Sequence, residues 1–289
     1  MFHNAHITDL IALLQRRGVS LFHACQYTDF CAYLALGGIP SRAVLATSGR
    51  PFTPFETDVH DRQNGVWDKV FVNLADFGEL FARGKRAVPN PYGPIVIQIR
   101  PEALLDAADV AVCYRSAGAA DFDRDREAMR HVAEVDALFM HPPESEFPWG
   151  SYLKPPAQLQ TLRPGARLPE VSCTVAGGRL ALGHVIVVWT DPYAPGGRPL
   201  RDWVGEAVAR AGAGFPVWER SCHAARPLYG ELLARVMAGG AALRPIAADA
   251  TASPALRAWA GDVLGLGLDY QFHRYACYLL AGTAGPLAA

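Results

Sequence analysis

Residues 21–42 read LFHACQYTDFCAYLALGGIPSR and carry the strongest fold signal in the chain. A short apolar strand is predicted over 19–23, ending on His23. A helix over 27–36 follows directly, and Gly37-Gly38 ends it. Taken alone, a histidine at the end of a strand is more often a hydrogen-bonded structural residue than a catalyst. The stretch therefore predicts a strand–helix unit with His23 where the strand meets the helix.

Outward from this unit, apolar runs alternate with loops rich in glycine, proline and polar residues. Composition and alternation predict further strands over 69–74, 95–99, 170–175 and 184–190. Helical spacing predicts helices over 7–18, 103–111, 123–140, 200–211, 227–238, 254–264 and 270–281. Turn-rich or proline-rich composition predicts long loops over 43–66, 84–94 and 141–169.

The order of these elements indicates an α+β fold in which separated short strands come first and helices come last. We place a domain boundary near residue 195, so that 1–195 form one domain and 196–289 form a helical region packed on it. The regular strand–helix alternation of a doubly wound sheet is absent. Neither GxGxxG nor GxxxxGK[ST] occurs, which excludes the two common glycine-rich phosphate loops.

Composition narrows the class of protein. The chain has 289 residues, of which 51% are hydrophobic and 19% charged, as expected of a folded globular protein. We find no apolar run long enough for a transmembrane helix and no export signal, and we expect a cytoplasmic protein without a membrane partner. The formal net charge of −1 provides no overall basic field for a long polyanion.

Cysteine spacing points to buried thiols rather than to disulfides or a metal site. The six cysteines are scattered without CxxC spacing, at positions 25, 31, 113, 173, 222 and 277. We therefore expect no bound metal. A hydrolase with Cys25, Cys31 or Cys222 as nucleophile is one alternative function. Cys222 precedes His223, but neighbours in a helix point to different faces, so the pair has no evident catalytic geometry.

Several residues have either a structural or a functional interpretation when each is judged alone. Glu170 opens an apolar strand directly after a proline-rich loop. It is either an exposed charge at a strand end or a carboxylate at the rim of a cleft, where it would stabilise a cation or bind a sugar hydroxyl. Arg62, in the polar stretch HDRQNG, reads as a solvated loop residue. The aromatic residues Trp67, Phe71, Phe77 and Tyr92 read as core or loop anchors.

The order of the segments resembles the ADP-ribosyltransferase fold, and most closely the DarT group of toxins that modify DNA bases. In that group a strand ends in histidine before a short helix, as in LFHACQYTDFCAYLALGGIPS. An arginine-bearing segment and an aromatic strand follow, as in DRQNGVWDKVFVNLADFG, and a glutamate then opens a strand, as in PEVSCTV. The resemblance covers roughly 19–190. Cys25 and Asp29 stand where the group has threonine and asparagine.

The resemblance implies a split mixed β-sheet with peripheral helices and a cleft that binds NAD as co-substrate. Glu170 would bind the 2′-hydroxyl of the nicotinamide ribose and stabilise the cation formed as nicotinamide leaves. Arg62 would secure a phosphate or assist the acceptor. His23 would hydrogen-bond the adenosine ribose, and an aromatic side chain would pack on nicotinamide. The implied NAD-binding residues are His23, Ala24, Cys25, Asp29, Phe71, Phe77 and Tyr92.

The resemblance also implies a target: a nucleic-acid base, modified by a toxin or phage-defence effector whose further partner would be an antitoxin protein. The loop over 141–169 would read that target, with Trp149 and Tyr152 stacking on a base. Phosphate contacts would come from Lys154, Arg163 and Arg167. Two alternatives remain open. The same chemistry would act on a protein, or the fold would serve as an inactive binding module whose helical region from 196 onward recognises a partner.

Overall fold

The computed structural model describes residues 1–53, 58–76, 93–119, 121–166, 168–192, 194, 197–220, 231, 235 and 243–265. Phe77, Tyr92, Arg167 and Cys222 lie outside the described residues, as do the helix predicted over 270–281 and most of that over 227–238. The chain divides into two compact units. Unit 1 comprises Met1–His23, Ala32–Ala75 and Gln98–Ile186, and unit 2 comprises Ala24–Cys31, Asp76–Ile97 and Val187–Ala289. The predicted boundary at residue 195 stays a prediction.

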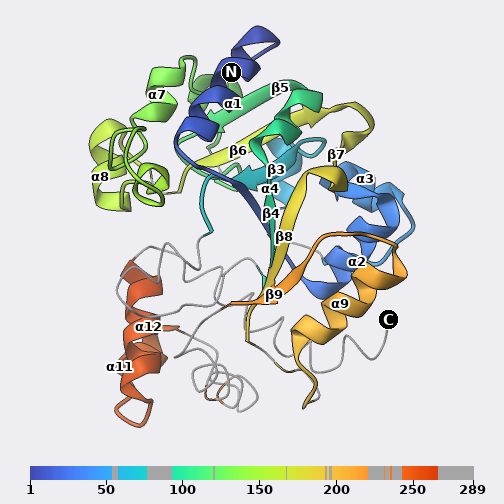
Figure 1. The fold of residues 1–289 in the computed structure, drawn as a ribbon. Helices are drawn as coiled ribbons and strands as arrows, with labels where there is room; N and C mark the ends of the chain where they lie inside the picture. Colours follow the sequence, from blue (N-terminus) through green and yellow to red (C-terminus); the bar gives the residue numbers. More distant parts are fainter. Residues whose placement is uncertain are drawn as a thin grey trace. The chain divides into compact units, whose positions relative to one another are not determined.

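The main sheet is mixed and has seven strands in the order β5-β6-β3-β1-β4-β8-β9 (Figure 1). Their bounds are β1 Leu21–Cys25, β3 Val70–Asn73, β4 Ile95–Ile99, β5 Ala107–Cys113, β6 Glu170–Val175, β8 Val185–Thr190 and β9 Val217–Glu219. Antiparallel pairing joins β1 to β3, β3 to β6 and β5 to β6, whereas β8 and β9 are parallel. The predicted combination of a mixed sheet with several helices is therefore confirmed.

The described helices are short, apart from four of ten or more residues. The long ones are α1 Ala5–Arg16, α2 Tyr27–Leu36, α9 Leu200–Arg210 and α12 Pro254–Gly265, and all four confirm predicted helices. The short ones are α3 Arg42–Thr47, α4 Asp58–Gln63, α6 Arg124–Glu127, α7 Val132–Asp136, α8 Pro156–Leu162 and α11 Leu243–Ala248. Single 3₁₀ segments are η1 Pro101–Asp106, η2 Trp149–Ser151, η3 Ala176–Gly178 and η4 Leu182–His184.

The double glycine after α2 does two different things. Gly37 adopts φ +70°, the left-handed conformation that ends a helix and that only glycine adopts without strain. Gly38 begins β2 (Gly38–Pro40), which pairs with β7 (Arg179–Ala181) in a second, two-stranded sheet. A Cβ on Gly38 would lie 2.6 Å from the carbonyl oxygen of Leu180, so the two backbones require glycine to approach this closely. The predicted helix stop is confirmed, and the small sheet was not predicted.

The helix predicted over 103–111 is wrong. Only Pro101–Asp106 forms a 3₁₀ segment, and Ala107–Cys113 is strand β5. β5 pairs with β6 along its length, and its last four residues are buried. Alanine favours a helix, but this preference is weak, and pairing with the distant strand β6 overrides it.

The single helix predicted over 123–140 is also wrong. Two short helices, α6 and α7, are separated by a backbone bridge from Ala128 to Cys113 and a hydrogen bond from the Met129 N–H to the Val112 carbonyl. Residues 128 and 129, within the predicted helix, therefore pair with the end of β5 instead of continuing the helix. The predicted loops contain short helices too: α3 and α4 overlap 43–66, and η2 and α8 lie within 141–169. Strand β9 lies in the region from 196 onward that was predicted to be helical.

Among the described residues, no helix has the length and apolar character needed to cross a membrane.

Candidate functional site

Glu170 lies at the first position of β6, in a row that runs across four strands of unit 1. The Cα partners in this row are Phe22 with Asn73, Asn73 with Glu170, and Glu170 with Cys113. Side chains directly opposite one another share a face of an antiparallel sheet. Glu170 therefore shares its face with Cys113, which belongs to an apolar cluster with Val66, Ala111, Ala117, Phe122 and Ala128.

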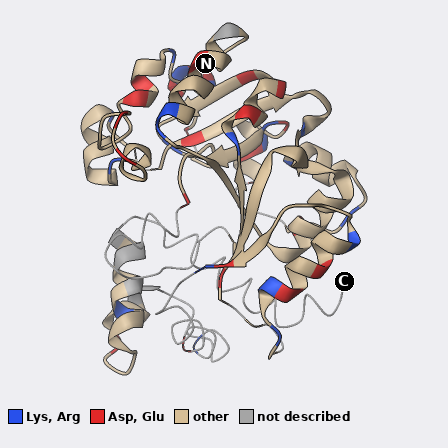
Figure 2. Cartoon of the chain, in the orientation of Figure 1, with Lys and Arg blue, Asp and Glu red and all other residues tan. Residues whose placement is uncertain are grey.

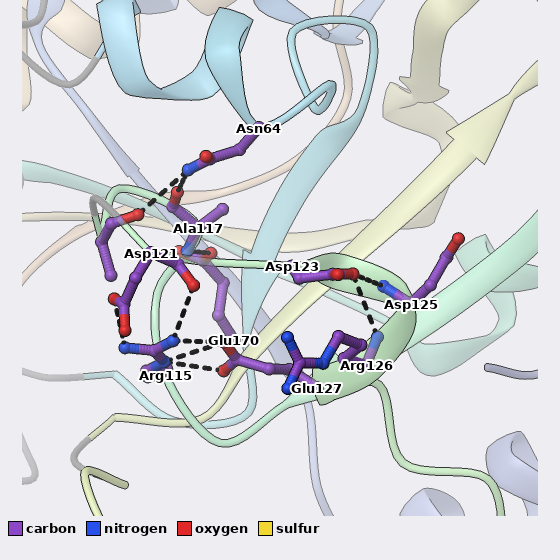
Figure 3. Close-up of polar contacts among 10 residues, drawn as sticks. Asn64, Arg115, Ala117, Asp121, Asp123, Asp125, Arg126, Glu127 and Glu170 are labelled. Carbon is purple, nitrogen blue, oxygen red and sulfur yellow. Dashed lines mark hydrogen bonds and ion pairs between the residues drawn. The ribbon is translucent and has the colours of Figure 1, made fainter.

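Two donors hold the Glu170 carboxylate. The Ala117 N–H donates to Oε2 at 2.8 Å, and the Ser116 hydroxyl donates to Oε1 at 3.1 Å. Both donors belong to the turn that follows β5. The Asn64 side-chain amide, just after α4, donates to the carbonyl oxygens of Ala117 at 2.9 Å and Ala119 at 3.0 Å. Figure 3 shows Asn64 beside the turn and Ala117 beside Glu170. Asn64 thus holds the turn in place, and the turn orients the Glu170 carboxylate.

The far side of the turn is anchored by an arginine. Arg115 donates to both carboxylate oxygens of Glu127, at 2.8–2.9 Å from Nε, and to Asp121 Oδ1 at 2.7 Å (Figure 3). Glu127 is buried and Asp121 is exposed. Because a bidentate contact fixes both distance and orientation, the segment that supplies the two donors to Glu170 is held at both ends.

The environment changes the acid–base behaviour of Glu170. Burial against the apolar cluster raises the pKa of Glu170 from 4.5 to about 7, and the nearby Asp61 carboxylate adds to the rise. The Ala117 N–H and the Ser116 hydroxyl oppose it because they favour the ionised form. The carboxyl group can therefore exist in either protonation state near neutral pH, which suits a group that must stabilise a developing cation or exchange a proton.

His23 is bonded at both ring nitrogens within unit 1. Nδ1 lies 2.8 Å from the carbonyl oxygen of Phe71, and Nε2 lies 3.1 Å from the Tyr33 hydroxyl. Burial is the main cause that lowers the pKa of His23 from 6.5 to about 4, so the ring is neutral. A carbonyl oxygen only accepts, so Nδ1 carries the proton and Nε2 accepts from Tyr33. His23 thus links β1 to β3, and the implied contact with an adenosine ribose stays a prediction.

The remaining implied NAD-binding residues fall into both units. Phe71 lies in β3 and packs half-buried against the apolar cluster beside Glu170. Ala24, Cys25 and Asp29 belong to unit 2, where Cys25 and Asp29 are buried. Burial and the Asp29 carboxylate raise the pKa of the Cys25 thiol well above its usual value.

Burial likewise raises the pKa of Cys31, and it raises the pKa values of Cys113 and Cys173 to about 12. A nucleophilic cysteine needs a thiolate, and all of these environments disfavour it. The described cysteines therefore do not support the alternative of a cysteine hydrolase.

Arg62, the second predicted catalytic residue, is exposed on α4. Its guanidinium carbon lies 4.1 Å from the centroid of the Trp67 ring. The same helix carries Asp61, which raises the pKa of Glu170, and Asn64 follows it directly. The structure therefore brings the segment containing Arg62 to the Glu170 turn, while the Arg62 side chain stacks on Trp67.

Of the described target-reading residues, Trp149, Tyr152 and Lys154 lie between α7 and α8, and Arg163 directly follows α8. Trp149 packs edge-on against Tyr152, with ring centroids 5.3 Å apart. Lys154 donates from Nζ to the Ala137 carbonyl at 2.5 Å, so its ammonium group is used inside the protein. The Arg163 guanidinium lies 5.8 Å from the Tyr114 ring.

The partners of Glu170 were missed from the sequence. Ser116 and Ala117 lie in RSAGA, a short stretch of turn-forming residues whose position at the end of a strand would have been the available signal. That strand, β5, was predicted as a helix. Asp61 lies one residue before Arg62 and Asn64 lies two residues after it, in the same polar stretch. A polar stretch alone does not distinguish them from solvated residues.

The raised pKa of Glu170 predicts a pH-dependent stability. A carboxyl group whose pKa is higher in the folded than in the unfolded state contributes stability below the unfolded value of 4.5. That contribution is lost as the pH rises through about 7. We expect the melting temperature of the wild type, relative to that of Glu170→Gln, to fall across this window and then level off. Thermal unfolding of both proteins at matched pH values tests this, and a constant difference would contradict the assignment.

The described residues contain no group of three or more His, Cys, Asp or Glu side chains that could hold a metal ion. The site described above consists of the Glu170 carboxyl group, its two donors, the nearby Asp61 carboxylate and the apolar cluster. Comparison with protein-family models finds no match for this chain, and comparison with curated proteins finds none either.

Proposed function

We propose that this protein is an NAD-dependent ADP-ribosyltransferase with a split sheet of the type that the sequence resemblance implies. The reaction breaks the bond between nicotinamide and its ribose, and nicotinamide leaves with the bonding electron pair. The acceptor then attacks the ribose carbon and gives up a proton. The observation that carries the proposal is the Glu170 carboxyl group at the head of β6, held by Ala117 and Ser116 over an apolar cluster.

Glu170 has the properties that this reaction needs. A fixed carboxylate beside a developing positive charge stabilises it without reorganisation, and low local polarity strengthens the effect. The two hydrogen bonds to its oxygens set the direction of the carboxylate. In the proposal, Phe71 on the neighbouring strand packs against nicotinamide, and Arg62 secures a phosphate or the acceptor.

The proposed acceptor is a nucleic-acid base, as the resemblance implies, with a protein side chain as the second candidate. One observation favours the second candidate. Lys154, one of the predicted phosphate contacts, has its ammonium group hydrogen-bonded to the Ala137 carbonyl. The net charge of −1 likewise provides no general attraction for a polyanion.

Incubation of the purified protein with NAD labelled in its adenylate tests the reaction and its acceptor together. Separate reactions contain single-stranded DNA, RNA or a protein extract, and free nicotinamide is measured in each. Nicotinamide release with transfer of label supports the proposal, and the labelled pool identifies the acceptor. An absence of both nicotinamide release and transferred label in all three reactions would contradict the enzyme and leave the binding module as the better description.

His23 supplies a second test. We expect His23→Ala to raise the KM for NAD by about tenfold or more, with a smaller effect on kcat, because the proposal places this ring in the nucleotide-binding segment. The matched variant Tyr33→Phe removes only the hydrogen bond to Nε2 and shows how much of the change comes from the internal contact. A wild-type KM in His23→Ala would contradict the assignment of this residue.

A further inference from the structure

An exposed group of apolar side chains lies in the loop between α7 and α8. We call residues 140–152 the aromatic loop. Met140, Phe147 and Trp149 are 42%, 82% and 52% exposed, although side chains of these types are usually buried. They lie within ten residues of one another on one closed loop, whereas single exposed apolar residues scattered over a surface need no explanation. Their concentration makes this loop a candidate interaction surface.

The aromatic loop is held in a fixed shape at its base. The Met140 N–H donates to the Tyr152 carbonyl at 2.8 Å, and a backbone bridge joins Phe139 to Leu153. Arg17 directly follows α1, and its side chain is only 2% exposed. It donates from Nη1 to the carbonyl oxygens of His141 at 2.8 Å and Gly150 at 2.9 Å. One buried guanidinium therefore bonds to both arms of the loop.

The exposed rings are themselves supported by neighbours. Trp149 contacts His141 and Tyr152 edge-on, with ring centroids 5.8 and 5.3 Å away. The Phe147 ring lies over Gly18, where a Cβ would come within 3.3 Å of its edge. A surface held in this way loses little conformational entropy on binding, and that favours affinity.

The charge of the aromatic loop selects the kind of partner. Residues 140–152 contain Glu144 and Glu146 but neither Lys nor Arg, and both glutamates are exposed. Figure 2 shows this red colour in the loop between α7 and α8. The adjoining lysine, Lys154, is hydrogen-bonded to Ala137. An acidic rim repels phosphate but attracts Lys and Arg, and Arg stacks favourably on a tryptophan face.

We propose that the aromatic loop binds a segment of a partner protein that presents Arg or Lys side chains beside an apolar side chain. The apolar side chain packs against Phe147 and Trp149, and the basic side chains pair with Glu144 and Glu146. The binding needs neither NAD nor Glu170, so it stands apart from the proposed transfer reaction.

Binding of short labelled peptides to the full chain, measured by fluorescence anisotropy, tests the proposal. The probes are a peptide that alternates Arg with Leu, the same peptide with Glu in place of Arg, and a single-stranded oligonucleotide. The variants are Trp149→Ala and the double variant Glu144→Lys/Glu146→Lys. Trp218→Ala is the matched control, because Trp218 is 53% exposed and lies in β9. Circular dichroism verifies that each variant is folded.

We expect the Arg–Leu peptide to bind and the Glu–Leu peptide not to bind. Trp149→Ala and the double charge reversal should each weaken binding by about tenfold or more, and Trp218→Ala should leave it unchanged. Two results would overturn the proposal. One is an oligonucleotide that binds the wild type and is weakened by Trp149→Ala, which would identify a nucleic-acid surface. The other is peptide binding that is absent or insensitive to both loop variants.

Discussion

Glu170→Gln should lower the rate of ADP-ribosyl transfer by about a hundred- to a thousandfold, the loss typical of removing one electrostatic contact to a transition state. The substitution preserves the shape of the side chain and an oxygen that can accept from the Ala117 N–H or the Ser116 hydroxyl. It removes the negative charge that would face the ribosyl cation. The effect should therefore fall on kcat much more than on the KM for NAD. Steady-state release of nicotinamide measures both constants.

Glu206→Gln is the control for this experiment. Glu206 lies on α9, half of its side chain is exposed, and it pairs with Arg198 at 2.6 Å, so its loss should leave transfer unchanged. Circular dichroism of Glu170→Gln separates a chemical loss from misfolding. Transfer at the wild-type rate in a folded Glu170→Gln protein would remove Glu170 from the mechanism.

The pH dependence of the same reaction reports on the ionisation of Glu170. The carboxylate is the form that stabilises a cation, and the pKa of Glu170 is about 7 because burial disfavours its charge. We expect kcat to rise with pH through this value and then level off. Ser116→Ala should shift the midpoint upward, because the Ser116 hydroxyl favours the charged form. A midpoint that does not respond to this variant would assign the titration to another group.

The position of Glu170 could be predicted from the sequence, whereas its surroundings could not. PEVSCTV combines β-branched residues with a preceding proline, and these local signals place a strand that begins at Glu170. Its donors come from the turn after β5, and β5 forms only because Ala107–Cys113 pairs with β6, some sixty residues later in the chain. Local composition in that stretch favours a helix, so a non-local contact decides the outcome.

For His23, too, local structure could be predicted from the sequence, whereas its hydrogen-bond partners could not. A strand and a helix here could be predicted, because apolar spacing and the double glycine are local. The predicted strand end at His23 is wrong, because β1 runs from Leu21 to Cys25 and His23 lies in its middle. Its bonds to the Phe71 carbonyl and to the Tyr33 hydroxyl depend on how β1 lies against β3 and α2. A sequence gives no direct measure of either distance. The tautomer and the low pKa of His23 follow from these contacts and could not be predicted without them.

Arg124→Met should lower the free energy of unfolding by about 3–5 kcal/mol, because it removes one partner of a largely buried ion pair. Arg124 lies on α6 and is 8% exposed. It donates from Nε to the Ser172 hydroxyl at 2.9 Å and forms an ion pair with Asp109. Ser172 is two residues after Glu170 in β6, so Arg124 joins α6 to the same face of the sheet. Urea unfolding at neutral pH measures the loss.

The electrostatics of Asp109 explain why the arginine matters. Burial alone would raise the pKa of Asp109, but the neighbouring Thr174 side chain and the Arg124 guanidinium hold that pKa below its usual value. Without Arg124, a partly buried carboxylate keeps its charge and loses its main compensation. Adding Asp109→Asn to Arg124→Met should therefore restore part of the lost stability, so the double variant is less destabilised than the sum of the single variants.

Arg126→Met separates this ion pair from a general effect of removing an arginine from α6. Arg126 is exposed on the same short helix, and surface substitutions usually change stability by less than about 0.5 kcal/mol. Strictly additive losses for Arg124→Met and Asp109→Asn, or equal losses for Arg124→Met and Arg126→Met, would contradict the role of the pair. A non-additive loss of stability that occurs with Arg124→Met and not with Arg126→Met would establish that Arg124 holds α6 against β6 beside Glu170. The turn between β5 and α6 needs this contact to keep its two donors on the Glu170 carboxylate.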